Sequence, residues 1–185
     1  PLSGEEEIDF AGQRHALLIT RFPLLNEDGV ITSVCVQALD ISERKHAEEQ
    51  LRLAARMFER AAEGLLVTDA RGRILTVNEA FTHITGYSQE EARGKTPSLL
   101  RSSRQNDDFY AEMWRQITEQ GWWQGEIWNK RKDGEVYLEW LSINAVRDAE
   151  GVVVNYVGTF SDIQMVKESK QRMDYLATHD ELTGL

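Results

Sequence analysis

Hydrophobic and polar positions alternate most densely between Trp122 and Asp162. Two polar segments that contain glycine, residues 132–134 and 148–151, divide this stretch into three runs of strand length, which predicts three antiparallel strands joined by two hairpins. The middle strand carries apolar residues on both faces: Tyr137, Leu141, Ile143 and Ala145 on one, and Val136, Leu138, Trp140 and Val146 on the other. Because an antiparallel sheet in a small domain normally leaves one face to water, a second apolar face predicts a cover from a helix, a ligand or a partner chain.

The beginning of the chain repeats the pattern of this sheet. Residues 14–29 align without gaps on residues 136–151, with Gly29 opposite Gly151, an offset of 122 positions. Asp40 aligns with Asp162 at the same offset. A repeat with the same turn chemistry predicts tandem copies of one domain. We therefore expect residues 1–41 to be the C-terminal hairpin of a truncated preceding domain, in which Cys35 is an ordinary strand residue.

A charged segment with helical periodicity follows the repeat. Its apolar residues are spaced by four, three and four positions and form what we call the apolar seam: Ala47, Leu51, Ala54 and Phe58. This narrow seam predicts a linker helix over residues 42–57. Two interpretations stay open: the seam pairs with a second chain in a coiled-coil-like dimer, or it packs on an exposed sheet face of its own domain.

Short strands and short helices occupy the segment between the linker and the three strands. Apolar runs at 64–69 and 74–78 predict two strands joined by a tight turn. Asn78 is a candidate N-cap of a short helix, Ser88 begins a capping-box pattern, and residues 106–120 predict an amphipathic helix. This order of elements predicts an α+β domain with one five-stranded antiparallel sheet.

Composition narrows the classes of function. The 185 residues include 31 acidic and 21 basic ones, a net charge of −10, which argues against nucleic acid as a partner because phosphate binding needs a basic surface. A single cysteine excludes an intramolecular disulfide and a thiolate metal cluster, and it fits a cytoplasmic setting. The apolar runs have only strand length, so we expect no direct membrane contact in this piece, while the parent protein can still be membrane-anchored.

Several motifs in combination resemble a PAS domain with its C-terminal PAC segment. They are EGLLVTD at 63–69, VNEAF at 77–81, ITGYS at 84–88, WQGEIWNKRKDGE at 123–135 and FSDI at 160–163. The resemblance covers residues 58–163 and implies the PAS fold: a five-stranded antiparallel sheet with short helices on one face that enclose a pocket, flanked by long signalling helices. Residues 40–45, DISERK, are similar to the exit of a preceding PAS domain, and ATHDELTGL at 177–185 resembles the opening of a GGDEF domain, the diguanylate cyclase fold, which we place at 179–185.

The resemblance implies a sensory and dimerisation module. A ligand or redox signal in the pocket would act on an exit helix, residues 164–178, whose own seam is Val166, Met173 and Leu176. The implied partners are a second copy of the chain, a small-molecule ligand and, in cis, a GGDEF output domain that metabolises cyclic di-GMP, with or without an EAL domain. The fragment itself, without the cyclase body, is expected to have no catalytic residues and no enzymatic activity. The alternative is a purely structural dimerisation module whose pocket is unliganded and filled by side chains.

Flavin is the cofactor that the resemblance leaves under consideration. The segment that contains Trp114 and Asn129 is similar to the FAD-holding PAS domain of a redox sensor from nitrogen fixation, so Trp114 would supply an aromatic wall and Asn129 an amide for FAD, while Trp128 alternates outward. In the other interpretation Trp114 is helix core and Asn129 is a satisfied amide. Haem is not expected, because residues 106–120 contain no histidine, and the complete domain lacks the cysteine that light-sensing relatives need.

No metal or phosphate site is predicted. His83 has no second histidine or cysteine at ligand spacing, and the pair His179-Asp180 has no third ligand nearby. Ser102 and Ser103 lie in a polar segment without the glycine-rich pattern of a phosphate loop.

Overall fold

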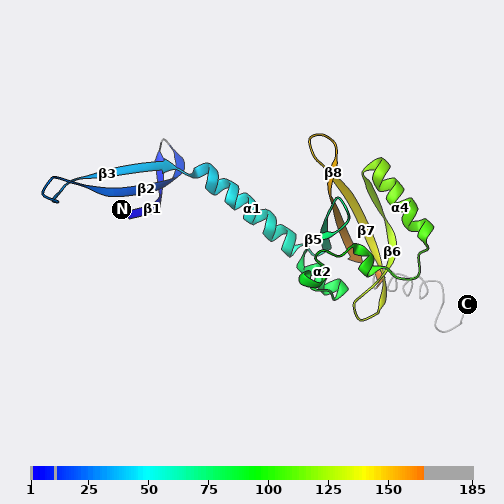
Figure 1. Ribbon diagram of the computed structural model, residues 1–185. Helices are drawn as coiled ribbons and strands as arrows, with labels where there is room; N and C mark the ends of the chain where they lie inside the picture. Colours follow the sequence, from blue (N-terminus) through cyan, green and yellow to red (C-terminus); the bar gives the residue numbers. More distant parts are fainter. Residues whose placement is uncertain (1, 11, 165–185) are drawn as a thin grey trace, which may run out of the picture. The chain divides into compact units, whose positions relative to one another are not determined.

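The computed structural model describes residues 2–10 and 12–164, and the chain divides into two compact units, residues 1–56 and residues 57–185 (Figure 1). Their helices and strands are β1 (Leu2–Phe10), β2 (Gln13–Leu25), β3 (Ile31–Asp40), α1 (Ser42–Arg60), β4 (Gly64–Asp69), β5 (Ile74–Val77), α2 (Glu79–Thr85), α3 (Gln89–Ala92), the 3₁₀ turn η1 (Pro97–Leu100), α4 (Asp107–Gln120), β6 (Trp122–Lys130), β7 (Val136–Arg147) and β8 (Val153–Asp162). The predicted exit helix beyond Gln164, with Val166, Met173 and Leu176, and the GGDEF opening at 179–185 lie outside the described residues.

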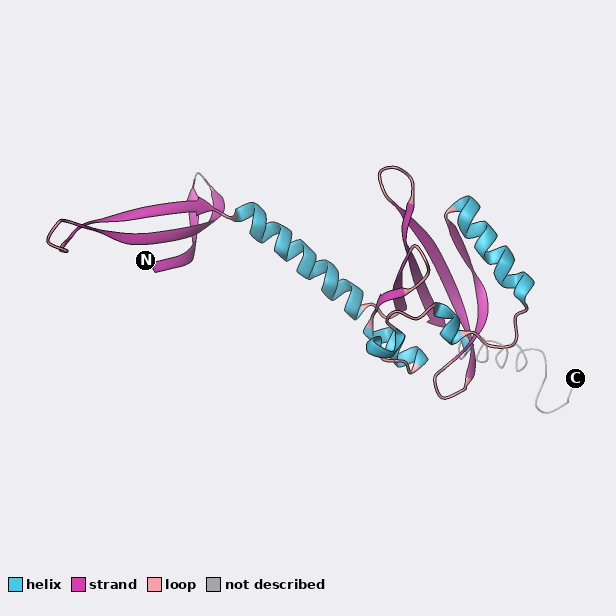
Figure 2. Cartoon of the chain, in the orientation of Figure 1, coloured by secondary structure: helices cyan, strands magenta, loops and turns pink. Residues whose placement is uncertain are grey.

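The first unit contains an antiparallel sheet in the order β1-β2-β3 (Figure 2). Strands β2 and β3 form the predicted hairpin, but the prediction of a hairpin alone was too short, because β1 adds a third strand. The sequence of β1, LSGEEEIDF, has three consecutive glutamates and therefore no apolar alternation. Strand β1 pairs with β2 along its whole length, and Glu6 lies 2.7 Å from Arg21 of β2, while Glu5 lies 2.7 Å from Lys45 in the first turn of α1.

The second unit is built on one five-stranded antiparallel sheet in the order β5-β4-β8-β7-β6. Helices α2, α3 and α4 and the turn η1 pack on one face of this sheet. The core between the two layers consists of buried apolar side chains from every one of these elements: Leu66, Ile74, Val77, Phe81, Ala92, Leu100, Met113, Ile117, Trp123, Ile127, Leu141 and Phe160. The predicted α+β fold with short helices on one face of the sheet is confirmed.

Polar side chains start the short helices where the sequence predicts them. The Oδ1 atom of Asn78 accepts hydrogen bonds from the backbone N–H of Phe81 and of Leu65, at 2.9 and 2.8 Å, so that one buried amide caps α2 and anchors β4. Ser88 and Glu91 form the capping box of α3. Gly86 ends α2 with a φ of 77°, a conformation that a residue with a Cβ atom rarely adopts.

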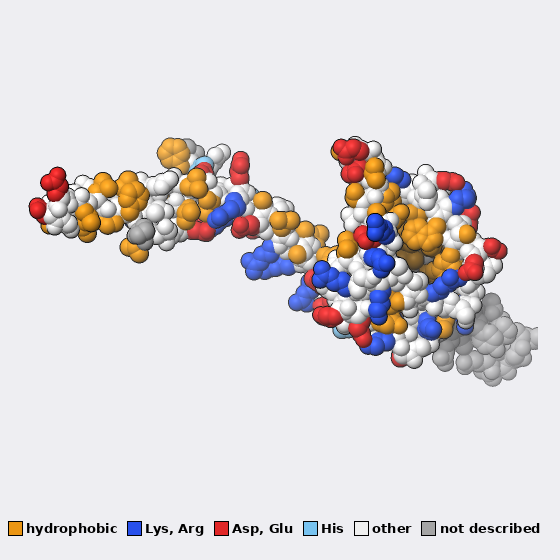
Figure 3. All heavy atoms as spheres, viewed as in Figure 1, with side chains coloured by type: hydrophobic (Ala, Val, Ile, Leu, Met, Phe, Trp, Pro, Cys, Tyr) orange, Lys and Arg blue, Asp and Glu red, His pale blue; other side chains and the backbone are white. Residues whose placement is uncertain are grey.

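The helix predicted over residues 42–57 extends to Arg60, and none of its residues is buried. Leu51, in the apolar seam, is 71% exposed; Ala47 and Ala54 are exposed too, and Phe58 is half-buried. Figure 3 shows hydrophobic side chains on the visible surface of this helix and of the strands before it. On the outer face of β7, Trp140 and Val146 are also exposed, whereas Leu138 is buried and Val136 is half-buried. Within the described residues, the apolar seam is therefore largely uncovered, and the outer face of β7 is covered in part.

The internal repeat extends to the hydrogen-bonding register. In β2 and β3 Ile19 pairs with Ala38, and in β7 and β8 Leu141 pairs with Phe160, which is the same pairing at the offset of 122. Both pairs also shift register at corresponding places, between Leu24 and Leu25 and between Val146 and Arg147. The two hairpins are thus the same structure at two places in the chain.

Candidate ligand-binding pocket

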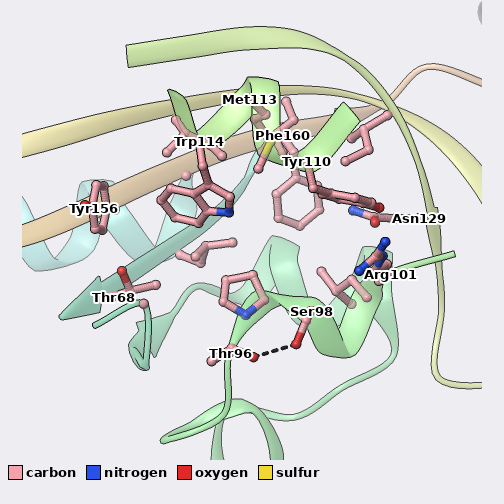
Figure 4. Close-up of a pocket in the computed structure, with 18 of the residues that line it drawn as sticks. Thr68, Thr96, Ser98, Arg101, Tyr110, Met113, Trp114, Asn129, Tyr156 and Phe160 are labelled. Atoms are coloured by element: carbon pink, nitrogen blue, oxygen red, sulfur yellow. Dashed lines mark hydrogen bonds between the residues drawn. The ribbon is translucent and has the colours of Figure 1, made fainter. Parts of the chain in front are cut away.

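A cavity of about 480 Å³ lies between the inner face of the five-stranded sheet and the segment from η1 to α4 (Figure 4). Its walls are mainly apolar and aromatic, and they include Leu66, Leu100, Tyr110, Met113, Trp114, Ile127, Leu141, Ile143, Tyr156 and Phe160. Small-molecule sites in proteins are typically concave, mostly apolar and of this size, with a few polar groups that fix the ligand. This cavity is therefore the candidate functional site.

The two predicted flavin residues both line this cavity, Trp114 from α4 and Asn129 from β6. Trp114 is 42% exposed and packs edge-to-face on Tyr156, with ring centroids 5.4 Å apart. The interpretation of Trp114 as helix core is wrong, because that position belongs to Met113, one residue earlier and buried. Trp128 is not among the described lining residues; Arg104 stacks on its ring at 3.8 Å, as its predicted outward orientation requires.

Asn129 is held by a buried acid that the sequence interpretation missed. Its Nδ2 atom donates a hydrogen bond of 2.8 Å to Glu139 Oε1, and the hydroxyl of Tyr137 donates one of 2.7 Å to Glu139 Oε2. Glu139 lies on β7, lines the cavity and is 1% exposed. Burial raises its pKa from 4.5 to about 7, against the two hydrogen bonds, which favour the ionised form. Burial likewise raises the pKa of Tyr137.

The sequence pattern of β7 could have indicated that Glu139 is buried. Position 139 lies between Tyr137 and Leu141 on the strand face that points into the core, so a glutamate there breaks an otherwise apolar series. A lone inward acid in an apolar strand has to be paired or neutral, which makes it a functional candidate.

Tyr110 is a second polar residue that the sequence analysis did not single out. The residue lines the cavity, and its buried hydroxyl makes no hydrogen bond of regular geometry with the described residues. Burial raises the pKa of this hydroxyl, whereas Arg101, whose guanidinium stacks on the ring at 4.1 Å, lies close enough to lower that pKa. In Figure 4, Tyr110, Arg101 and Asn129 lie at one end of the cavity, and Trp114 and Tyr156 lie toward the other.

The cavity thus combines the edge-to-face rings of Trp114 and Tyr156 with a polar end that contains Tyr110 and the hydrogen-bonded pair Asn129 and Glu139. A buried hydroxyl without a regular hydrogen bond costs free energy until a ligand or water satisfies it. An indole ring and an amide are groups that a flavin ring can contact, and Trp114 and Asn129 place both of them at the cavity.

The remaining candidates from the sequence stay apart from the cavity. His83 is at the surface, 3.5 Å from Glu79. The hydroxyl of Ser102 donates to the backbone carbonyl of Trp128. Across residues 2–10 and 12–164 no three His, Cys, Asp or Glu side chains are grouped as a metal site would need, and His179-Asp180 lie outside this range. No helix in the described part of the chain has the length and apolarity to cross a membrane.

Comparison with known proteins identifies the fold. A family model described as PAS fold matches residues 52–163. The chain is 34% identical over 117 residues to a nitrogen fixation regulatory protein of Klebsiella oxytoca, which covers 63% of this chain and 24% of the regulator. It is 28% identical over 137 residues to the probable diguanylate cyclase DgcE of Escherichia coli, which covers 70% of this chain and 12% of that protein.

Among solved structures, one described as "Flavin Analogue Sheds Light on Light-Oxygen-Voltage Domain Mechanism" superimposes with a TM-score of 0.53 at 26% identity, covering 65% of this chain and 96% of that one. The chain therefore spans a whole domain of that structure. It spans a quarter or less of the length of the two sequence relatives.

Proposed function

This chain belongs to the PAS family, whose domains are sensory and not themselves catalytic, and from that premise we propose that its second unit detects a small ligand in the cavity and signals through the flanking helices. Its homology to a nitrogen fixation regulator and to a probable diguanylate cyclase supports a role in signal transduction. The observation that carries the proposal is the cavity itself, which is large enough for a ligand and has a polar end with a buried hydroxyl that makes no regular hydrogen bond to the described residues.

The ligand we propose is a flavin, with FAD as the first candidate. Trp114 would provide the aromatic wall and Asn129 the amide, and a bound flavin would make the domain responsive to redox state. The similarity to a flavin-related light-oxygen-voltage structure supports this assignment.

The test is an absorption spectrum of the freshly purified chain, followed by acid release of any chromophore and by reloading with FAD. We expect the bands of oxidised flavin, lost in Trp114→Ala and Asn129→Ala. Trp122→Ala is the matched control, because Trp122 is similarly exposed and is not among the described lining residues. A colourless protein that takes up no FAD would contradict the flavin assignment and favour the structural dimerisation module.

We further propose that the chain forms a homodimer through the apolar seam of α1. The seam has heptad spacing, and Ala47, Leu51 and Ala54 are exposed, as a surface that pairs with a second copy requires. The test is native mass spectrometry or analytical ultracentrifugation of Leu51→Glu, which should be monomeric. Leu53→Glu changes an exposed leucine outside the seam on the same helix and should remain dimeric.

The proposed output is cyclic di-GMP metabolism by a GGDEF domain after residue 185, with or without an EAL domain. Support comes from the resemblance at 177–185 and from the similarity to a probable diguanylate cyclase. In the parent protein, Leu51→Glu and Met173→Glu should change the rate of cyclic di-GMP turnover, whereas indifference to both would contradict transmission through the helices. The single cysteine fits our proposal that this happens in the cytoplasm.

We also propose that residues 1–41 are the C-terminal part of a preceding PAS domain. The support is the shared register of β2–β3 and β7–β8 and the shared turn chemistry. A longer fragment of the parent should pair another strand with the free edge of β3, and hydrogen exchange of the β3 amides should then slow relative to this chain.

A further inference from the structure

A chain of contacts leads from the cavity to the end of β8. The ring of Tyr137, whose hydroxyl donates to Glu139, lies 4.0 Å from the guanidinium carbon of Arg131. Arg131 Nη2 donates to Asp162 Oδ2 at 2.5 Å. Asp162 is the last residue of β8, and its Oδ1 atom accepts a hydrogen bond of 2.9 Å from the backbone N–H of Gln164. The contacts therefore reach Gln164, the last described residue of the chain.

Glu139 and Asp162 are also direct neighbours, because they are paired across the β7–β8 ladder. Side chains of paired residues project from the same face of an antiparallel sheet. Arg131 contacts the carboxylates of Asp162 and Glu135 and the backbone carbonyl of Ile84. Its charge also favours the ionised form of Glu139. In a partly buried site of low dielectric constant, a change of charge on Glu139 acts strongly on Arg131 and Asp162.

We propose that Glu139 is a proton-binding switch in the pocket and that its charge is transmitted through Tyr137 and Arg131 to Asp162. When Glu139 is neutral, it does not compete with Asp162 for Arg131, and the ion pair between Arg131 and Asp162 holds the end of β8. An ionised Glu139 attracts Arg131 and repels Asp162, which loosens the ion pair at the exit. The proton is exchanged with solvent, so no other reactant is needed.

The surroundings of Glu139 support a proton-dependent switch. The groups that face it are Asn129 from β6, Tyr137 from β7, Tyr110 from α4, Arg131 from the β6–β7 turn and Asp162 from β8, with Arg101 at the same end of the cavity. Among the described lining residues Glu139 is the only acid. Burial and Asp162 oppose its ionisation, whereas Tyr137, Asn129 and Arg131 favour it, so the balance falls near neutral pH.

Through this switch, a ligand in the cavity would act on the protonation state of Glu139. This effect rests on the pocket of the proposed function. A ligand that presents an N–H group to Glu139 favours the ionised form, and one that presents only an acceptor favours the protonated form. Whether the ligand presents a donor or an acceptor to Glu139, and not only whether a ligand is bound, then determines how firmly Arg131 and Asp162 are paired.

The experiment is a pH titration of the unliganded 185-residue chain by two-dimensional NMR, from about pH 5 to about pH 9. We expect the backbone amides of Asn129 and of Asp162 to shift with one common midpoint near neutral pH. In Glu139→Gln this transition should disappear at both positions. In Tyr137→Phe, which keeps the ring over Arg131 but removes the donor to the carboxylate, the common midpoint should rise by about one pH unit.

The matched control is Glu135→Gln, which removes an exposed carboxylate that also contacts Arg131 and should leave the transition in place. A transition at Asp162 that persists in Glu139→Gln, or separate midpoints at the two amides, would overturn the proposal. If Glu139→Gln does not fold, infrared spectra of the wild-type chain decide: a protonated carboxyl band must be present at mildly acidic pH and vanish above neutral pH. Since no ligand is used, these outcomes are independent of whether a flavin binds.

Discussion

The hairpins β2–β3 and β7–β8 share their register but not their surroundings. Each ends in Asp-Ile, and in each the N–H of that isoleucine donates to the carbonyl of an equivalent residue, Ile41 to Ala16 and Ile163 to Leu138. In the first unit Asp40 is exposed, and its hydrogen bonds to Ser42 and then to His15 hold its pKa at about 2. In the second unit Asp162 is tied to Arg131 and lies beside a buried acid.

The comparison teaches which properties a hairpin acquires from its own sequence and which from its neighbours. Register, turn and exit geometry are the same in both units and are therefore local. Burial is not: Phe160 is 1% exposed beneath the helices, whereas its counterpart in β3 is the exposed residue Ala38. Likewise Glu139, which is critical to the pocket, corresponds to Leu17 in β2. The site therefore arises where helices cover the sheet.

The largest expected effect comes from replacing Phe160 of the second unit by alanine, the residue at the corresponding position 38 of the first unit. Phe160→Ala removes a buried ring that packs edge-to-face on Phe81, with centroids 5.8 Å apart. It should lower the free energy of unfolding of the second unit by about 3–5 kcal/mol. Hydrogen exchange of the β8 amides measures this loss, and Ala38→Phe is the control, within about 0.5 kcal/mol because position 38 is exposed. Equal effects at both positions would contradict the distinction between the hairpins.

The pH dependence of stability should also separate the two units. Glu139 has a folded-state pKa of about 7 against an ordinary value of 4.5, so the folded state binds the proton more tightly. Its contribution is then fully present at acidic pH and is lost as the pH rises through 7, by roughly 3 kcal/mol in total. Denaturant unfolding at a series of pH values should show this decline in the wild-type second unit and a flatter profile in Glu139→Gln. An increase of stability between pH 5 and 8 that depends on Glu139 would contradict the assignment.

A smaller loss of stability is expected from a substitution in β4, a strand with no counterpart in the described part of the first unit. A Cβ atom on Gly64 of β4 would lie 2.4 Å from Phe160 Cζ. Gly64→Ala should therefore cost about 1–3 kcal/mol by overpacking. The double variant with Phe160→Ala should lose less than the sum of the two single variants, because the clash needs the ring. Strict additivity would show that Gly64 matters for another reason.

The smallest effect is expected from the reverse exchange, Leu17→Glu. Position 17 is only half-buried, so the new carboxyl group stays hydrated and the stability of the first unit should change by about 1 kcal/mol or less. An NMR titration should give this group an ordinary glutamate pKa. A midpoint near neutral pH would mean that the hairpin alone, without the helices, creates the environment of Glu139.

Most of the architecture could be predicted from the sequence, because it depends on local sequence, as the shared register of the two hairpins does. Turn glycines, the N-caps Asn78 and Ser88 and the alternation in β7 act over a few residues, and each predicted the element that is found. The repeat identified β2 and β3 because their apolar patterns match. Strand β1 was missed because it pairs with β2 without an apolar alternation of its own.

The site was accessible only in part. Residue type and resemblance pointed to Trp114 and Asn129, and both line the cavity, while their contact with a flavin stays a prediction. Whether Met113 or Trp114 is the core residue of α4 depends on the rotation of the helix against the sheet, which the helical period leaves open by one position. The environment of Glu139 depends on residues from four elements, and no local pattern encodes it.

The pairing of β4 with β8 has a consequence for how this domain can be rearranged in evolution. Gly64, which begins β4, pairs with Phe160, near the end of β8, at the centre of the sheet. The start of β4 and the end of β8 therefore lie side by side, although most of the fold lies between them in the sequence. A gene segment that encodes such a unit can be duplicated or inserted into another protein without stretching either junction. The same closure makes the unit a natural candidate for circular permutation, with new ends in the exposed turn between β7 and β8.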